Sequence, residues 1–113
     1  MSEDYDNLVE DLKALDGCPF AENGWETRPK SDSWGVVTLE YEAGTLHGDN
    51  LKQAEAYEGS MHLFSKAKDG AGWIPLIKSV MTEYCDGAWS LNHHAYERET
   101  GLFHWEWIFQ VEG

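Results

Sequence analysis

Residues 101–111 have the sequence GLFHWEWIFQV, in which a large apolar side chain occupies every second position. Alternate side chains of an extended strand point to opposite faces, so this segment presents two different surfaces. One surface carries the aromatic row Phe103, Trp105, Trp107, Phe109 and Val111, and the other carries Leu102, His104, Glu106, Ile108 and Gln110. The segment therefore predicts a β-strand whose aromatic row is buried.

Residues 89–98 are predicted to form the partner strand of a hairpin, because a short connection that includes Gly101 joins the two segments. If Arg98 pairs with Leu102, three apolar residues share the face of the aromatic row: Trp89, Leu91 and Ala95. A slip of one residue would instead bring polar residues opposite that row: Asn92, His94 and Arg98. The hydrophobic pattern therefore favours the first register.

The length and charge of the chain limit its possible roles. Its 113 residues suffice for a single domain, residues 1–113, with one hydrophobic core. Acidic residues number 21 against 8 Lys and Arg, which gives a formal net charge of −13. Affinity for DNA comes largely from basic side chains that neutralise phosphates, so we expect no direct, sequence-specific binding to nucleic acid.

The sequence contains two cysteines, Cys18 and Cys85. They are too few for a four-thiolate zinc site and too far apart for a redox pair, so each is expected to be a small buried hydrophobe. No segment has the pattern of a secretion signal or the length needed to cross a bilayer. We therefore expect a reduced, cytoplasmic protein without a membrane partner.

Two segments have the apolar spacing of amphipathic helices, each followed by a glycine that would end it, Gly17 or Gly87. The first follows Ser2 and has the stripe Tyr5, Leu8, Val9, Leu12 and Leu15. The second has Pro75 near its first turn and the stripe Ile74, Ile77, Val80, Met81 and Tyr84. Residues 18–25 indicate an irregular connector whose two aromatic side chains fold back against the core.

Two further strands are predicted between the helices, at residues 34–41 and 54–66, with a bulge or bend at Gly59. Residues 42–53 indicate a loop with room for a short strand at residues 45–47. The expected fold class is α+β: an antiparallel sheet of about four strands with two helices packed on one face, in the order α-β-β-α-β-β.

Histidines on the predicted outer face raise the alternative of a metal site. In the predicted register, His94 lies opposite Glu106 and Tyr96 lies opposite His104, which would bring two imidazoles and a carboxylate together. The sequence has no Cys-x-x-Cys pair and no His-x-x-x-His pair on a helix. We therefore expect cross-strand polar pairs and no metal or other cofactor, while metal binding by these histidines stays an open alternative.

No sequence pattern indicates catalysis. Carboxylate pairs such as Glu97 and Glu99 are expected by chance in so acidic a chain, and no glycine-rich phosphate loop or nucleophile elbow is present. Glu106 stands between Trp105 and Trp107 in the sequence, where a base-stacking sheet would interleave Lys or Arg. A mixed apolar and polar surface suited to contacts between subunits is predicted instead, formed by Tyr96, Leu102, His104 and Ile108.

Several segments resemble one family of proteins: Cys18-Pro19-Phe20-Ala21 with Trp25 and Pro29, Trp34–Val37, Gly59–Ser65, Trp89–Asn92 and Glu97–Trp107. Together they are similar to small structural proteins of the head-to-tail module of tailed bacteriophages and prophages, of the tail-terminator or tail-completion type. The likeness runs from about Leu8 to Gly113 and is most specific in the closing hairpin. Two departures are Trp34, where the family would have a tyrosine, and His62, where an acidic residue would be commoner.

This resemblance implies a protein that acts by assembly and is not an enzyme. Its expected partners are other copies of itself in a ring of six, the tail-tube protein and the head–tail connector protein. The expected location is the virion tail or neck, and the host cytoplasm during assembly.

Two alternatives remain from the residues themselves. A chain this acidic is also suited to be a monomeric adaptor or DNA-mimic inhibitor that binds a basic host protein. The second alternative is a small hydrolase or metal-dependent enzyme.

Overall fold

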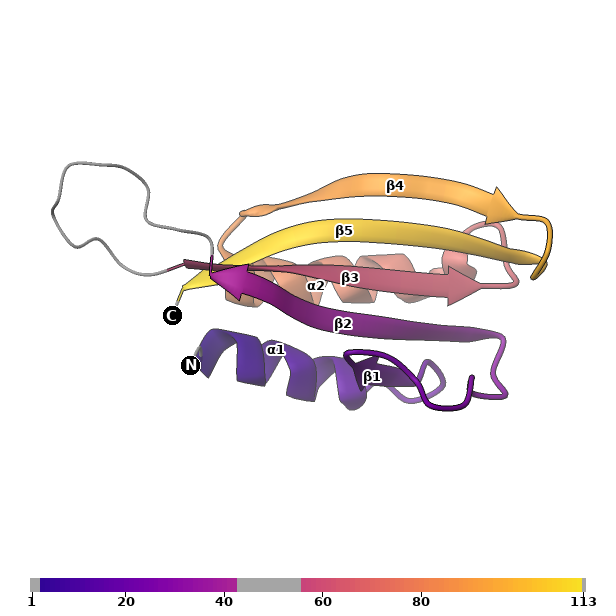
Figure 1. Cartoon of the computed structure of the whole chain (residues 1–113), viewed down its shortest axis with the longest axis horizontal. Helices are drawn as coiled ribbons and strands as arrows, with labels where there is room; N and C mark the ends of the chain where they lie inside the picture. Colours follow the sequence, from indigo (N-terminus) through magenta and orange to yellow (C-terminus); the bar gives the residue numbers. More distant parts are fainter. Residues whose placement is uncertain (1–2, 43–55, 113) are drawn as a thin grey trace, which may run out of the picture.

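The computed structural model describes residues 3–42 and 56–112 of the chain. Its elements are α1 (Glu3–Lys13), β1 (Phe20–Glu22), β2 (Ser33–Glu42), β3 (Ala56–Ser65), the 3-10 turn η1 (Gly70–Gly72), α2 (Trp73–Cys85), β4 (Trp89–Glu97) and β5 (Leu102–Glu112). The strands form one five-stranded sheet in the order β1-β2-β3-β5-β4. Both helices cover the same face of this sheet, which we call the inner face (Figure 1). The expected α+β class is confirmed.

Helix α1 forms where acidic side chains and an apolar stripe coincide. Its first turn contains Glu3, Asp4 and Asp6, whose negative charge is favourable beside the positive end of the helix dipole. Its buried side chains are Tyr5, Leu8, Val9 and Leu12, as the sequence spacing predicts. The stripe fixes which side of α1 faces the sheet.

Helix α2 begins directly after η1 and has Pro75 in its first turn, where a missing amide hydrogen costs nothing. The buried side chains of α2 are Ile77, Met81 and Cys85. The helix is followed by Asp86 and Gly87, both at positive φ, which is a common backbone conformation after a helix C-terminus. Tyr84 then donates a hydrogen bond of 2.8 Å to Asp11 and so connects α2 to α1.

The core lies between the helices and the central strands β3 and β5. Trp107 and Phe109 are the largest fully buried side chains, and Met61, Leu63 and Ile77 pack in the same cluster. The prediction that the aromatic row of residues 103–111 faces the helices is confirmed, since all five of its side chains are buried or packed against this cluster. Burial of this row is the main favourable contribution to folding.

A fifth strand, β1, was not predicted, and it pairs in parallel with Gly35 to Val37 of β2. A Cβ atom at Gly35 would lie 2.4 Å from the Phe20 ring, so the glycine makes room for that ring. Phe20 is buried, and the Trp25 indole donates a hydrogen bond of 3.0 Å to the Gly35 carbonyl. The aromatic side chains of this connector therefore fold back as predicted, but residues 20–22 form a strand rather than an irregular segment, and the sheet is mixed.

The irregularity predicted at Gly59 lies in the neighbouring strand. The register of β2 against β3 shifts between Leu39 and Tyr41, and Leu39 pairs with Gly59. A Cβ atom at Gly59 would lie 2.4 Å from the Thr38 carbonyl oxygen, so close approach of the two backbones requires glycine there. The short strand predicted at residues 45–47 lies outside the described residues.

The predicted register of the closing hairpin is wrong by one residue at its closed end. Glu97, and not Arg98, pairs with Leu102, and consequently His94 pairs with Trp105. The register shifts between Leu91 and His93, so that Asn92 is the extra residue of a β-bulge.

The bulge changes which side chains of β4 face inward. Before it, Trp89 and Leu91 pair with residues of the aromatic row, as predicted. Beyond it, His94 and Tyr96 take the inner face and Ala95 moves to the outer face, opposite His104. The prediction placed Ala95 inward because it assumed one register along the whole strand. The bulge instead shifts the residues after Asn92 by one position, while Trp89 and Leu91 stay on the inner face.

Leu63→Ala tests the position of the core. Leu63 is 0% exposed in the centre of the cluster, so truncation should lower the free energy of unfolding by about 2–5 kcal/mol, measured by urea denaturation. Leu76→Ala on α2 is the matched control, because Leu76 is 47% exposed and its truncation should change stability by less than about 1 kcal/mol. Equal losses in the two variants would contradict the assigned core.

Candidate functional site

Aromatic rings stand side by side across the face opposite the helices, which we call the outer face. The rings of Trp34 and Phe64 have centroids 4.2 Å apart, and those of Phe64 and His104 are 4.3 Å apart, each pair nearly parallel. The Arg28 guanidinium lies over the Trp34 ring, 5.6 Å from its centroid. The flat faces of these rings are thus occupied by one another, which leaves little ring surface for a stacked ligand.

Two histidines and two glutamates form a continuous polar chain beside these rings. His62 Nδ1 and His104 Nε2 are 2.8 Å apart, and His104 Nδ1 lies 3.2 Å from Glu97 Oε2. At the other end, His62 Nε2 lies 3.6 Å from Glu106 Oε2. Because a carboxylate only accepts, His104 donates from Nδ1 to Glu97 and accepts at Nε2 from the Nδ1–H of His62. The chain connects β3, β5 and β4.

The surroundings of His104 disfavour its charged form. Burial is the largest cause of its lowered pKa, and the neighbouring His62 adds to the effect. Glu97 acts in the opposite direction and raises the pKa. The folded protein therefore favours the neutral form of His104 more than water favours that of an exposed histidine.

The four residues predicted to form an interface are not all on one exposed surface. Leu102, His104 and Ile108 lie on the outer face, but Leu102 is only 1% exposed and His104 is half-buried. Tyr96 lies on the inner face, beside Phe103, and is 53% exposed. The hairpin register explains this separation, and the role of the four residues as an interface stays a prediction.

The histidines weighed as metal ligands are also separated. His94 stacks on Trp105 at the inner face, and the position opposite Glu106 that was predicted for His94 is taken by His93. The neighbour of His104 is His62, a contact that the sequence did not predict, because only the strand order places β3 beside β5. Within residues 3–42 and 56–112, no group of three or more His, Cys, Asp and Glu side chains is arranged to hold a metal ion.

Strand β4 forms an edge of the sheet and has β5 as its single neighbour among the described strands. Most of its side chains are exposed, including Leu91 and Tyr96, each 53% exposed. Large exposed apolar side chains along an unpaired edge are typical of a surface that contacts another chain.

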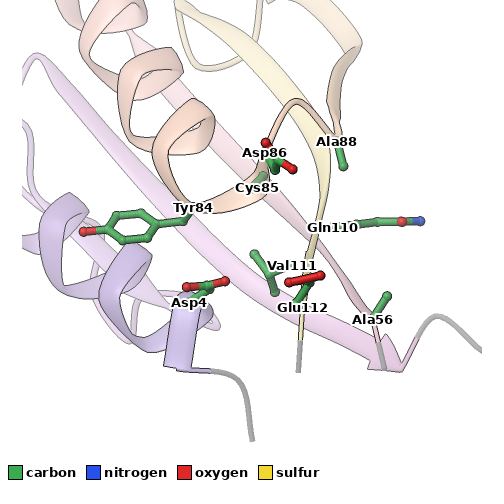
Figure 2. Close-up of a pocket in the computed structure, with 9 residues that line it drawn as sticks. All are labelled: Asp4, Ala56, Tyr84, Cys85, Asp86, Ala88, Gln110, Val111 and Glu112. Carbon is green, nitrogen blue, oxygen red and sulfur yellow. The ribbon is translucent and has the colours of Figure 1, made fainter. Parts of the chain in front are cut away.

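A hollow of about 220 Å³ lies at the end of the molecule where α1 begins and α2 ends. Figure 2 shows Asp4, Asp86 and Glu112 around it, together with Cys85 and Tyr84. Three carboxylates beside the negative end of the α2 dipole make this hollow complementary to a positive group. No local sequence pattern indicates this hollow, because its residues come from segments far apart in the chain.

The nucleophile-type side chains around this hollow are held in their neutral forms. Burial raises the pKa of the Cys85 thiol to about 12, and Asp4 adds to the shift. The hydrogen bond to Asp11 raises the pKa of Tyr84 to about 12. Cys18 is equally protected, since burial raises its pKa to about 12. A protonated thiol is a poor nucleophile, so these groups are unsuited to covalent catalysis near neutral pH.

The two ends of the sheet differ in charge. The loops that precede β2, follow β3 and connect β4 to β5 meet at one end (Figure 1). They carry most of the described basic side chains, Arg28, Lys30, Lys66, Lys68 and Arg98, together with four acidic ones, Glu26, Asp32, Asp69 and Glu99, so positive and negative charges nearly balance there. The end with the hollow carries Glu3, Asp4, Asp6, Asp86 and Glu112, and no Lys or Arg lies in these segments of the described chain. We call the two surfaces the basic end and the acidic end.

Comparison with known proteins shows the fold alone. No family model and no curated protein matches the sequence. Among solved structures, 13 chains match. One of them, whose name states no function, has a TM-score of 0.60 and 10% sequence identity, covering 95% of this chain and 87% of its own. In the described residues, no helix has both the length and the apolar character required to cross a membrane.

The lowered pKa of His104 predicts a pH-dependent stability. An unfolded histidine has a pKa near 6.5, so just below this pH the unfolded chain binds more protons than the folded one. The free energy of unfolding should therefore fall between about pH 7.5 and about pH 5.5. His104→Gln should reduce this fall in urea denaturation, whereas His94→Gln, at an exposed position, should preserve it. If the free energy of unfolding depends equally on pH in the wild type and both variants, His104 is not the group responsible.

Proposed function

We propose that this protein is a structural subunit of a tailed-phage particle, which forms a ring, caps the tail tube and joins it to the head connector without catalysis. Its sequence motifs resemble such proteins. The observation that carries the proposal furthest is the difference in charge between the acidic end and the basic end.

A joining protein needs two different surfaces for two different partners. The acidic end presents carboxylates around a hollow, and the basic end presents lysines and arginines among a similar number of carboxylates in three loops. Surfaces that differ in this way favour different partners and set the direction in which the subunit is inserted. The hydrogen-bonded helices and sheet between them act as a rigid spacer.

A second candidate is a monomeric, acidic adaptor or DNA mimic that binds a basic host protein. The acidic end favours it, because clustered carboxylates resemble a run of phosphates in charge. This function would use one end of the molecule, whereas the joining function would use both.

Electron microscopy of the purified protein mixed with tail-tube protein tests the first function. We expect rings of the protein seated on tube ends, in a preparation where tubes alone have open ends. Stoichiometric capture by a basic DNA-binding protein, with bare tube ends in the mixture, would contradict the joining function and support the second candidate.

Charge reversals at the two ends form a matched pair of variants. Glu3→Lys with Asp6→Lys changes exposed residues of the acidic end, and Lys66→Glu with Lys68→Glu changes exposed residues of the basic end. Each double variant should weaken binding to one partner by about tenfold and leave the other unchanged, measured with tube and connector proteins separately. A loss confined to the acidic-end variant, for both partners, would contradict the use of two ends.

A further inference from the structure

The two edges of the sheet differ in how far they are covered. At the β2 edge, β1 pairs with Gly35 to Val37, and the Tyr5 hydroxyl of α1 hydrogen-bonds the backbone of Leu39. At the opposite edge, β4 has no described strand beyond it. Along all nine of its residues, β4 therefore has no described strand on its outer side.

The hydrogen-bond pattern between β4 and β5 determines which backbone groups of β4 point away from the sheet. Gln110 donates from its backbone N–H to the Ala88 carbonyl at 2.8 Å, so the even-numbered residues of β5 bond to β4. Beyond the bulge these residues pair with His93, Ala95 and Glu97. The N–H and C=O groups of His94 and Tyr96 consequently point away from the sheet.

This arrangement is complementary to itself. If a second β4 strand runs antiparallel about Ala95, His94 of each copy lies opposite Tyr96 of the other, and both residues direct their free backbone groups to each other. Side chains of opposite residues share a face, so the His94 and Tyr96 rings meet on the inner face. On the outer face, His93 of one copy lies opposite the Glu97 carboxylate of the other.

Charge favours a second copy at this edge over other surfaces of the chain. The whole chain has a net charge of −13, but the nine residues of β4 contain one carboxylate, Glu97, which already contacts His104. Two copies can therefore approach along β4 with less repulsion than along α1 or the acidic end. The added contact of His93 with Glu97 is attractive when the histidine is protonated.

We propose that two copies of this chain pair through the edge of β4, residues 93–97, in an antiparallel ladder with its twofold axis at Ala95. The sheet then continues across the pair. The bulge at Asn92 limits the ladder to this short segment, so the association is weak and reversible. The inference concerns the free protein and goes beyond the joining function.

A disulfide at the twofold axis tests the register. Ala95 would face Ala95 of the second copy in a non-hydrogen-bonded pair, with Cα atoms about 4.5 Å apart, a separation that a disulfide can bridge. Ala95→Cys should therefore form a covalent dimer under mild oxidation. Ser90→Cys is the control, because Ser90 lies on the same strand and outer face but outside the ladder. Cys18 and Cys85 are buried and should not react.

The second measurement is analytical ultracentrifugation of the full chain at protein concentrations between about 10 µM and about 1 mM. The wild type should show a reversible monomer–dimer equilibrium, and Tyr96→Lys should raise its dissociation constant at least about tenfold. Leu76→Lys is the control, since Leu76 is also a large hydrophobic residue and is nearly as exposed but lies on α2. Circular dichroism confirms that each variant is folded.

The proposal is overturned if the wild type stays monomeric over this range, or if Ala95→Cys cross-links no faster than Ser90→Cys. It is also overturned if Leu76→Lys weakens the dimer as much as Tyr96→Lys. Failure of the joining function is a separate result. If the protein dimerises through β4 but never binds tubes, the joining function is wrong and the pairing through β4 stands. If the protein caps tubes without forming such dimers, the pairing through β4 is wrong.

Discussion

Burial of the aromatic row of β5 beneath α1 and α2 is the contact on which the rest of the structure depends. β5 lies between β3 and β4, so its inward side chains hold both neighbouring strands as well as the helices. At the bulge at Asn92 the backbone of β4 gives up regular pairing, while Trp89 keeps an inward position packed against the core.

Since the inner face is filled by the core, contacts with other molecules are left to the outer face, the edge and the two ends. The outer face is less available than its composition indicates, because Trp34, Phe64 and His104 stack on one another. The edge of β4 and the charged ends then remain as the surfaces best suited to other chains. Self-association and partner binding can use different parts of the molecule.

The sequence predicts the long, strongly periodic elements well, and misses what depends on contacts between distant segments. Both helices, the four long strands and the buried row follow from apolar spacing. Strand β1 has three residues and forms because Gly35 leaves room for Phe20, which no local pattern reveals. The contact between His62 and His104 depends on strand order, and the positions of Ala95 and Tyr96 depend on the bulge.

The same bulge has a consequence for aggregation. A flat, uninterrupted edge strand with few charges is a template on which further chains can stack into amyloid-like fibrils. In β4 the extra residue at Asn92 puts the outward hydrogen-bonding groups on its two sides out of phase with each other. An incoming strand cannot follow both stretches, so growth of a cross-β fibril from this edge is suppressed without any charged residue acting as a gatekeeper.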